Sequence, residues 1–156
     1  MRRHVYFYTH LDSPYRDIAA AFSGDPGMWL PAPAAADGDG WRVELKAEGA
    51  LPGPLATHGA AVRVGAVAGE GGELWRSITW SSLAAQRFFP VLEGDLELME
   101  LHGSGCQLSL MASYRPPLSV IGDAGDRLLG RQIAEACVRR FVLEAAGRLA
   151  AVTLHA

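Results

Sequence analysis

Arg76 carries the clearest chemical signal, because the sequence places its permanent charge on an apolar face. Ile78 and Trp80 follow it at a spacing of two residues, and strict alternation along a strand puts all three side chains on the same side. A buried charge is costly unless it is paired. We therefore expect a partner for Arg76, either a carboxylate such as Glu97 or Glu100 or an anionic or carbonyl group of a ligand. The alternative is that Arg76 lies at the strand end, with its stem buried and its head in water.

Aromatic side chains are the second group of candidates for ligand contact. Phe7, Trp41 and Trp80 are in phase with the buried sides of their predicted strands. Aromatic residues with a polar handle suit walls that hold flat or acyl ligands, and they equally suit a solid core. Core filling is favoured for Phe7, and both roles stay open for Trp41 and Trp80. With side chains from the short helices, the last strand and the last helix, the ligand-binding candidates are Phe7, Trp29, Trp41, Arg76, Trp80, Tyr114, Ile133 and Phe141.

The motifs of common catalytic and metal chemistry are absent from the sequence. It contains no H-E-x-x-H, G-x-x-x-x-G-K-[ST] or G-x-S-x-G, and the stretch "GAVAGEGG" lacks the Lys and the Ser or Thr that a phosphate cradle needs. Asp123 and Asp126 stand at the start of a predicted helix, where capping and the helix dipole favour acids. We expect no metal and no cofactor, and we assign no catalytic residue. The histidines are scattered over strand ends, turns and the terminus: His4, His10, His58, His102 and His155.

The composition is that of one globular domain spanning residues 1–156. A chain of 156 residues with 49% hydrophobic and 20% charged residues is long enough to bury a core and too apolar for a disordered protein. The net charge of −3 supplies no broad positive field, so we expect no nucleic-acid partner.

The sequence carries no signal for export or for a membrane. The basic start Met1-Arg2-Arg3 is followed by polar residues and by no small-residue cleavage site, and no apolar run reaches about eighteen residues. Cys106 and Cys137 lack a paired spacing such as C-x-x-C, so we take both as small buried hydrophobic residues in a reducing compartment. We therefore expect a cytoplasmic protein with no integral membrane segment.

Hydrophobic periodicity predicts the elements that must position these side chains. Ser13 as N-cap and Pro14 at the first helical position open a short helix, and a second short turn follows it. Apolar residues spaced by two predict strands in a meander with one buried and one wet face. The predicted helices cover 14–22, a turn at 28–30 and 126–149, and the predicted strands cover 5–10, 41–47, 62–66, 74–80, 89–101 and 106–115.

The last predicted helix is long enough to cross the whole sheet, at about 36 Å for residues 126–149. The Pro pair in "SYRPPLSVIGD" ends the strand before it, since proline cannot donate to a ladder. With one long helix available, a curved sheet has to wrap around its buried stripe, and such a wrap easily leaves a cavity. The stripe is Leu129, Ile133, Cys137, Phe141 and Ala145, and the polar line opposite is Arg127, Arg131, Glu135 and Arg139.

Several stretches resemble the SRPBCC superfamily, the START-like, helix-grip group of polyketide cyclases and dehydrases, lipid-transfer START domains and Bet v 1-type proteins. They are "LDSPYRDIAAAF", "FFPVLEGDLELMEL" and "SLMASYRPPLSVIGDAGDRLLGRQIAEACVRRFVLEAAGRLA", and the resemblance covers nearly the whole chain. It implies an α+β, helix-grip fold: a curved antiparallel sheet of six or seven strands wrapped around a long C-terminal helix, with two short helices after the first strand. The superfamily does not share catalytic residues, so the resemblance implies no site residue here.

The leading prediction is binding or transport of a hydrophobic or amphipathic small molecule, lipid-like or polyketide-like, in a cavity between the sheet and the C-terminal helix. The alternative is an enzyme of the polyketide cyclase, aromatase or dehydrase type, so whether the chain catalyses a reaction stays open. A third hypothesis is an interaction protein that uses the outer sheet face around Tyr6 and Tyr8. A homodimer also stays open.

Overall fold

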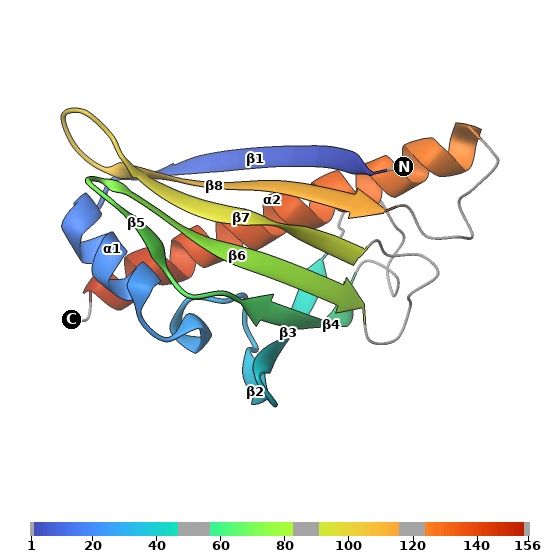
Figure 1. Cartoon of the computed structure of the whole chain (residues 1–156), viewed down its shortest axis with the longest axis horizontal. Coiled ribbons are helices and arrows are strands. Elements are labelled where there is room, and N and C mark those ends of the chain that lie inside the picture. The colour runs from blue at the N-terminus through green and yellow to red at the C-terminus, as the bar shows by residue number, and fades with distance from the viewer. Residues whose placement is uncertain (1, 47–56, 83–90, 116–123, 155–156) are drawn as a thin grey trace.

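The protein consists of one antiparallel sheet and one long helix that lies along it (Figure 1). The structure is a computed structural model that describes residues 2–46, 57–82, 91–115 and 124–154. The Pro pair at 116–117 and Asp123 lie outside the described residues. The elements in chain order are β1 (Arg3–Leu11), α1 (Tyr15–Ser23), the 3-10 turn η1 (Pro26–Met28), β2 (Ala35–Asp37), β3 (Gly40–Lys46), β4 (Thr57–Val64), β5 (Ala68–Glu70), β6 (Glu73–Ser82), β7 (Val91–Glu100), β8 (Cys106–Arg115) and α2 (Ala124–Leu154).

The strands form one sheet in the order β1-β8-β7-β6-β4-β3-β2, with β5 paired to β6 outside this path. All pairings are antiparallel. The predicted α+β class, with a long C-terminal helix against an antiparallel sheet, is confirmed. The described sheet has eight strands rather than six or seven, because β2 and β5 are three-residue strands too short to show an alternation. Among the described strands, β1 ends the sheet at one side, so one of its edges has no partner from them.

The core lies between the inner face of the sheet and α2. The register of the strands places four core side chains side by side: Tyr114, Leu92, Trp80 and Val62. All four side chains are at most 3% exposed, and Trp80 packs against Phe141 of α2 with ring centroids 5.0 Å apart. The alternating apolar residues of each strand thus meet the apolar stripe of the helix.

Helix α2 shows the predicted stripe over the part where its side chains are described. Ile133, Cys137 and Phe141 are buried, whereas Arg131 and Arg139 are exposed. The helix begins before residue 126 and continues past 149, to Leu154. In the described residues, no helix combines the length and the hydropathy that a membrane span requires.

The start of α1 differs from its prediction. Pro14 occupies the N-cap position rather than the first helical position, and no side chain caps the helix. The helix begins at Tyr15 and buries Ile18 and Phe22. Burial of these two side chains, rather than a Ser13 cap, therefore holds the helix in place.

Gly94 is required by the close approach of β7 and β8. A Cβ at this position would meet the backbone oxygen of Met111 and would lie 2.6 Å from the Cα and 2.7 Å from the Cβ of Ala112. Because backbone cannot move aside as a flexible side chain can, we expect Gly94→Ala to lower the free energy of unfolding by about 2 kcal/mol, measured by urea denaturation.

Gly147→Ala is the matched control. A Cβ at Gly147 of α2 would meet nothing within 4 Å, so the same substitution should stabilise the helix by up to about 1 kcal/mol. Equal stabilities for the two variants would show that the β7–β8 approach is not close.

Candidate functional site

Arg76 is buried, with 8% of its surface exposed, and it points to the inner side as its spacing predicts. Its Nε donates a hydrogen bond to the carbonyl of Gly65 at 2.8 Å. Its Nη1 donates to the carbonyls of Phe22 at 2.8 Å and Gly24 at 2.9 Å. These two carbonyls lie at the C-terminal end of α1, where the helix dipole favours a cation. Arg76 therefore fastens α1 to β6.

The expected partners of Arg76 need correction. The hydrogen bonds that hold it go to backbone carbonyls and not to Glu97 or Glu100, and the residue as a whole is 8% exposed. Glu97 is paired in register with Trp75, whose side chain is on the face opposite to Arg76, and its carboxyl is hydrogen-bonded to Glu73. Burial, that bond and the charge of Glu73 raise the pKa of Glu97.

Burial lowers the pKa of Arg76, and the charge of nearby Asp25 partly opposes this. The guanidinium carbon lies 6.0 Å from the ring centroid of Trp29, at the limit of a cation–π contact. Trp29 in turn stacks on Phe22 with centroids 5.7 Å apart. The Nε1 of Trp29 is buried and has no hydrogen-bond partner in the described part of the chain. Arg76 and Trp29 thus form one packed cluster at the end of α1.

A groove of about 780 Å³ lies between β1 and α2. This volume falls in the range of small-molecule sites. β1 is the strand at one side of the sheet, and α2, which crosses the sheet, packs against it (Figure 1). The lining consists of residues 4–7 of β1 and, from α2, Arg131, Gln132, Glu135, Ala136, Arg139, Arg140 and Leu143.

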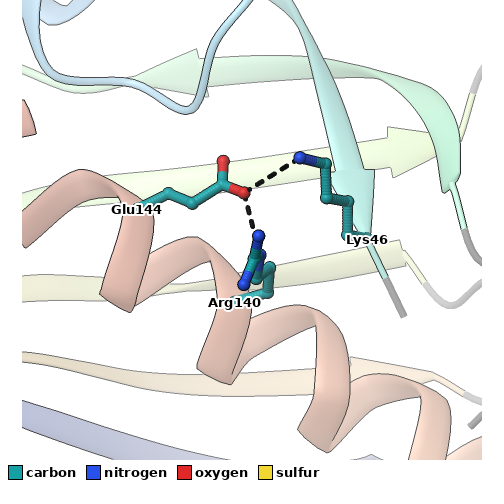
Figure 2. Close-up of polar contacts among 3 residues, drawn as sticks. All are labelled: Lys46, Arg140 and Glu144. Atoms are coloured by element: carbon teal, nitrogen blue, oxygen red, sulfur yellow. Dashed lines mark hydrogen bonds and ion pairs between the residues drawn. The ribbon is translucent and has the colours of Figure 1, made fainter. Parts of the chain in front are cut away.

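Ion pairs along α2 fix most of the charges at this groove. The Nε of Arg131 donates to Glu135 at 2.9 Å, and the Nε of Arg140 donates to Glu144 at 2.9 Å. The same oxygen of Glu144 accepts from Lys46 at 3.3 Å, which ties α2 to the end of β3 (Figure 2). Arg139 has no ion-pair partner among residues 2–46, 57–82, 91–115 and 124–154. With Arg131 paired to Glu135 and Arg140 paired to Glu144, the charge of Arg139 leaves the groove positive.

Solved structures share this architecture, although no protein-family model and no curated protein match the chain. Norcoclaurine synthase from Thalictrum flavum is similar with a TM-score of 0.56 and 11% identity, over 100% of this chain and 88% of that one. A conserved protein from Geobacillus kaustophilus has a TM-score of 0.57 and 14% identity, over 96% of both chains. Ara h 8.0201 has a TM-score of 0.52 and 11% identity, over 100% of both.

This chain has a helix-grip fold of the Bet v 1 type. The predicted resemblance is thereby confirmed for the fold, which is what likeness at 11–14% identity establishes.

The helix-grip core takes up most of the predicted cavity candidates. Trp80 and Phe141 pack on each other, and Ile133 is 2% exposed in the same cluster. Trp41 is half-buried and lies against Gly27, where a Cβ would be 2.6 Å from its ring. The candidates therefore divide between this core and the cluster of Arg76 and Trp29. A ligand-binding role for them stays a prediction.

Two candidates lie at or near the groove. Phe7 belongs to its lining and is half-buried. Tyr114 is 2% exposed, and burial raises its pKa. Among the nearby charges, those of Arg3 and Arg131 lower this pKa and that of Glu135 raises it. Tyr114 therefore lies within electrostatic reach of the charged end of the groove.

The arginines of the groove were missed as site residues. The sequence pattern places Arg131, Glu135 and Arg139 on the polar line of α2, and such a line is usually a solvated face. The signal that could have identified them is the third arginine, Arg140, which broadens the line to a positive surface. The position of these arginines beside β1 depends on a long-range contact, which hydrophobic periodicity does not encode.

The outer face of the helix-grip sheet carries exposed apolar side chains, as the interaction hypothesis requires. Tyr6 and Tyr8 are each 50% exposed, with ring centroids 5.9 Å apart. Met111, opposite Tyr6 in register, is 62% exposed.

In the described ranges, no group of three or more His, Cys, Asp or Glu side chains could hold a metal ion.

Replacing Arg76 tests whether its hydrogen bonds to the backbone stabilise the fold. Arg76→Met removes the donors to three carbonyls, at least one of them buried. We expect the free energy of unfolding to fall by about 3 kcal/mol, measured by urea denaturation. Arg63→Met, which breaks an exposed pair with Asp39, should change it by no more than about 0.5 kcal/mol. Similar values for both variants would show that the hydrogen bonds of Arg76 do not stabilise the fold.

The two thiols should be unreactive in the folded protein. Burial raises the pKa of Cys106 to about 11 and that of Cys137 to about 12. At pH 8 only about one Cys106 thiol in a thousand is then ionised, and the thiolate is the reactive form. We expect Ellman's reagent to label both within seconds to minutes in 6 M guanidinium and neither in buffer on that scale. Rapid labelling in buffer would show that a thiol is accessible.

Proposed function

We propose that this helix-grip domain binds a hydrophobic or amphipathic small molecule in the groove between β1 and α2. The observation that carries the proposal is the groove of about 780 Å³, in which apolar side chains adjoin charged ones. Val5 and Phe7 supply apolar surface from β1, and Ala136 and Leu143 supply it from α2. A cytoplasmic location and a single domain over residues 1–156 stay predictions from the sequence.

The expected affinity follows from the apolar surface that a ligand would bury. An acyl chain that buries about 300 Å² of apolar surface gains about 7 kcal/mol before ordering costs. These costs amount to several kcal/mol, so we expect dissociation constants from micromolar to millimolar for simple amphiphiles.

A cyclase-type enzyme is the alternative, and norcoclaurine synthase is by its name an enzyme with this fold. General acid–base catalysis requires a group that exchanges protons near neutral pH. His4 lines the groove, and histidine is the usual side chain for this role, but among the described residues no hydrogen bond joins it to a second groove side chain. The bonded pair there is Arg131 with Glu135, and arginine keeps its proton. The groove geometry therefore supports binding better than it supports catalysis.

Leu143 offers a direct test, because it lines the groove and is 39% exposed. Leu143→Glu places a charge on the apolar part of the groove without opening the core. We expect it to weaken binding of the neutral fluorescent probe N-phenyl-1-naphthylamine by about tenfold, since the apolar contact is lost. The fluorescence titration should be accompanied by native mass spectrometry of the purified protein for a retained apolar ligand.

Leu154→Glu is the matched control, on the same helix but outside the groove lining and 80% exposed. It should bind the probe as the unmodified protein does. Equal binding by both variants would place the ligand elsewhere, and a protein that neither binds the probe nor retains a ligand would contradict the proposed function.

A further inference from the structure

We propose that the groove selects amphiphiles with an anionic end group, a carboxylate or a phosphate monoester, and that Arg139 binds this group. The inference rests on the proposed function, because it names the ligand class for the same groove. Its basis is the charge, the pairing and the order of the side chains along α2.

The charge of the groove is opposite to that of the whole chain. The chain carries a net charge of −3, whereas Arg131, Arg139 and Arg140 face a single lining carboxylate, Glu135. A cleft lined by one sign of charge beside apolar walls concentrates ligands of the other sign. Neutral and cationic amphiphiles gain nothing from this arrangement.

The ion pairs distinguish Arg139 from its two neighbours. Arg131 is held by Glu135 and Arg140 by Glu144, each through Nε at 2.9 Å. In the part of the chain that the structure describes, no carboxylate lies within ion-pair distance of Arg139. Arg139 is exposed and lines the groove, so its donors are available to a ligand. A guanidinium can bind a carboxylate or a phosphate through two parallel hydrogen bonds.

The order of residues along the groove matches an amphiphile lying lengthwise. Arg131, Glu135, Arg139 and Leu143 follow one another at intervals of four, so they form a single line on α2. β1 and α2 run in the same direction, which puts Phe7 on the side of the groove toward Leu143 (Figure 1). A chain packed on these apolar residues brings its end group to Arg139, one helical turn away.

The test compares amphiphiles that share a chain and differ in the end group. Displacement of N-phenyl-1-naphthylamine is measured with dodecanoate, dodecyl phosphate and 1-dodecanol, all below their critical micelle concentrations. We expect at least one of the two anions to bind about tenfold more tightly than the alcohol, and this preference to shrink in high salt. In Arg139→Gln the preference should fall to within about twofold, with binding of the alcohol unchanged.

Arg16→Gln is the matched control. Arg16 is exposed on α1, and its replacement changes the net charge by the same amount away from the groove. It should keep the full preference for the anion. If Arg16→Gln loses the preference, or Arg139→Gln keeps it, Arg139 is not the binding residue.

Three outcomes would overturn this inference, and they differ in what they mean for the proposed function. Equal binding of anions and alcohol by the unmodified protein, with Leu143→Glu still defective, overturns the inference and leaves the proposed function standing. Absence of any amphiphile binding overturns both. Arg139-dependent binding to phosphatidylglycerol vesicles without binding of monomeric dodecanoate or dodecyl phosphate would overturn the groove site in favour of a membrane surface.

Discussion

Packing of the apolar stripe of α2 on the inner face of the sheet determines where the other parts of this protein lie. Ile133, Phe141 and Leu149 are at most 2% exposed, and burial of each such side chain contributes about 1.5–3 kcal/mol. The helix packs against β1 at one side of the sheet and against β3 near the other side. The groove lies between β1 and the polar flank of the helix.

Arg76 supplies a second constraint at the other end of the molecule. A buried charge is tolerated there because its donors are matched by three backbone carbonyls, two of them at the end of α1. The planar, branched guanidinium can span these carbonyls, whereas a lysine ammonium presents its donors from a single point. Since its Nε and Nη1 are committed to the fold, Arg76 is less suited to a ligand than Arg139, which is exposed.

The sequence predicted the fold well because the fold is expressed in local periodicity. Alternation over 41–47 and 74–80 predicted strands that became β3 and β6, and the fourfold spacing on α2 predicted its buried stripe. Three-residue strands were not predicted, since they contain too few residues to establish a period. The Ser13 cap was wrong because Pro14 has an extended ψ of 138° and therefore lies before the first helical residue, at the N-cap.

By itself, the sequence determined which side of each strand and of the last helix is buried, and it placed Arg76 on the inner side, because these properties depend on neighbours a few residues apart. Only the tertiary structure decided what those sides meet. The carbonyls that hold Arg76 lie 11, 52 and 54 residues away in the chain. The groove brings residues 4–7 beside Arg131 and Arg139. Such contacts depend on how elements distant in the chain pack together, and no local pattern contains that information.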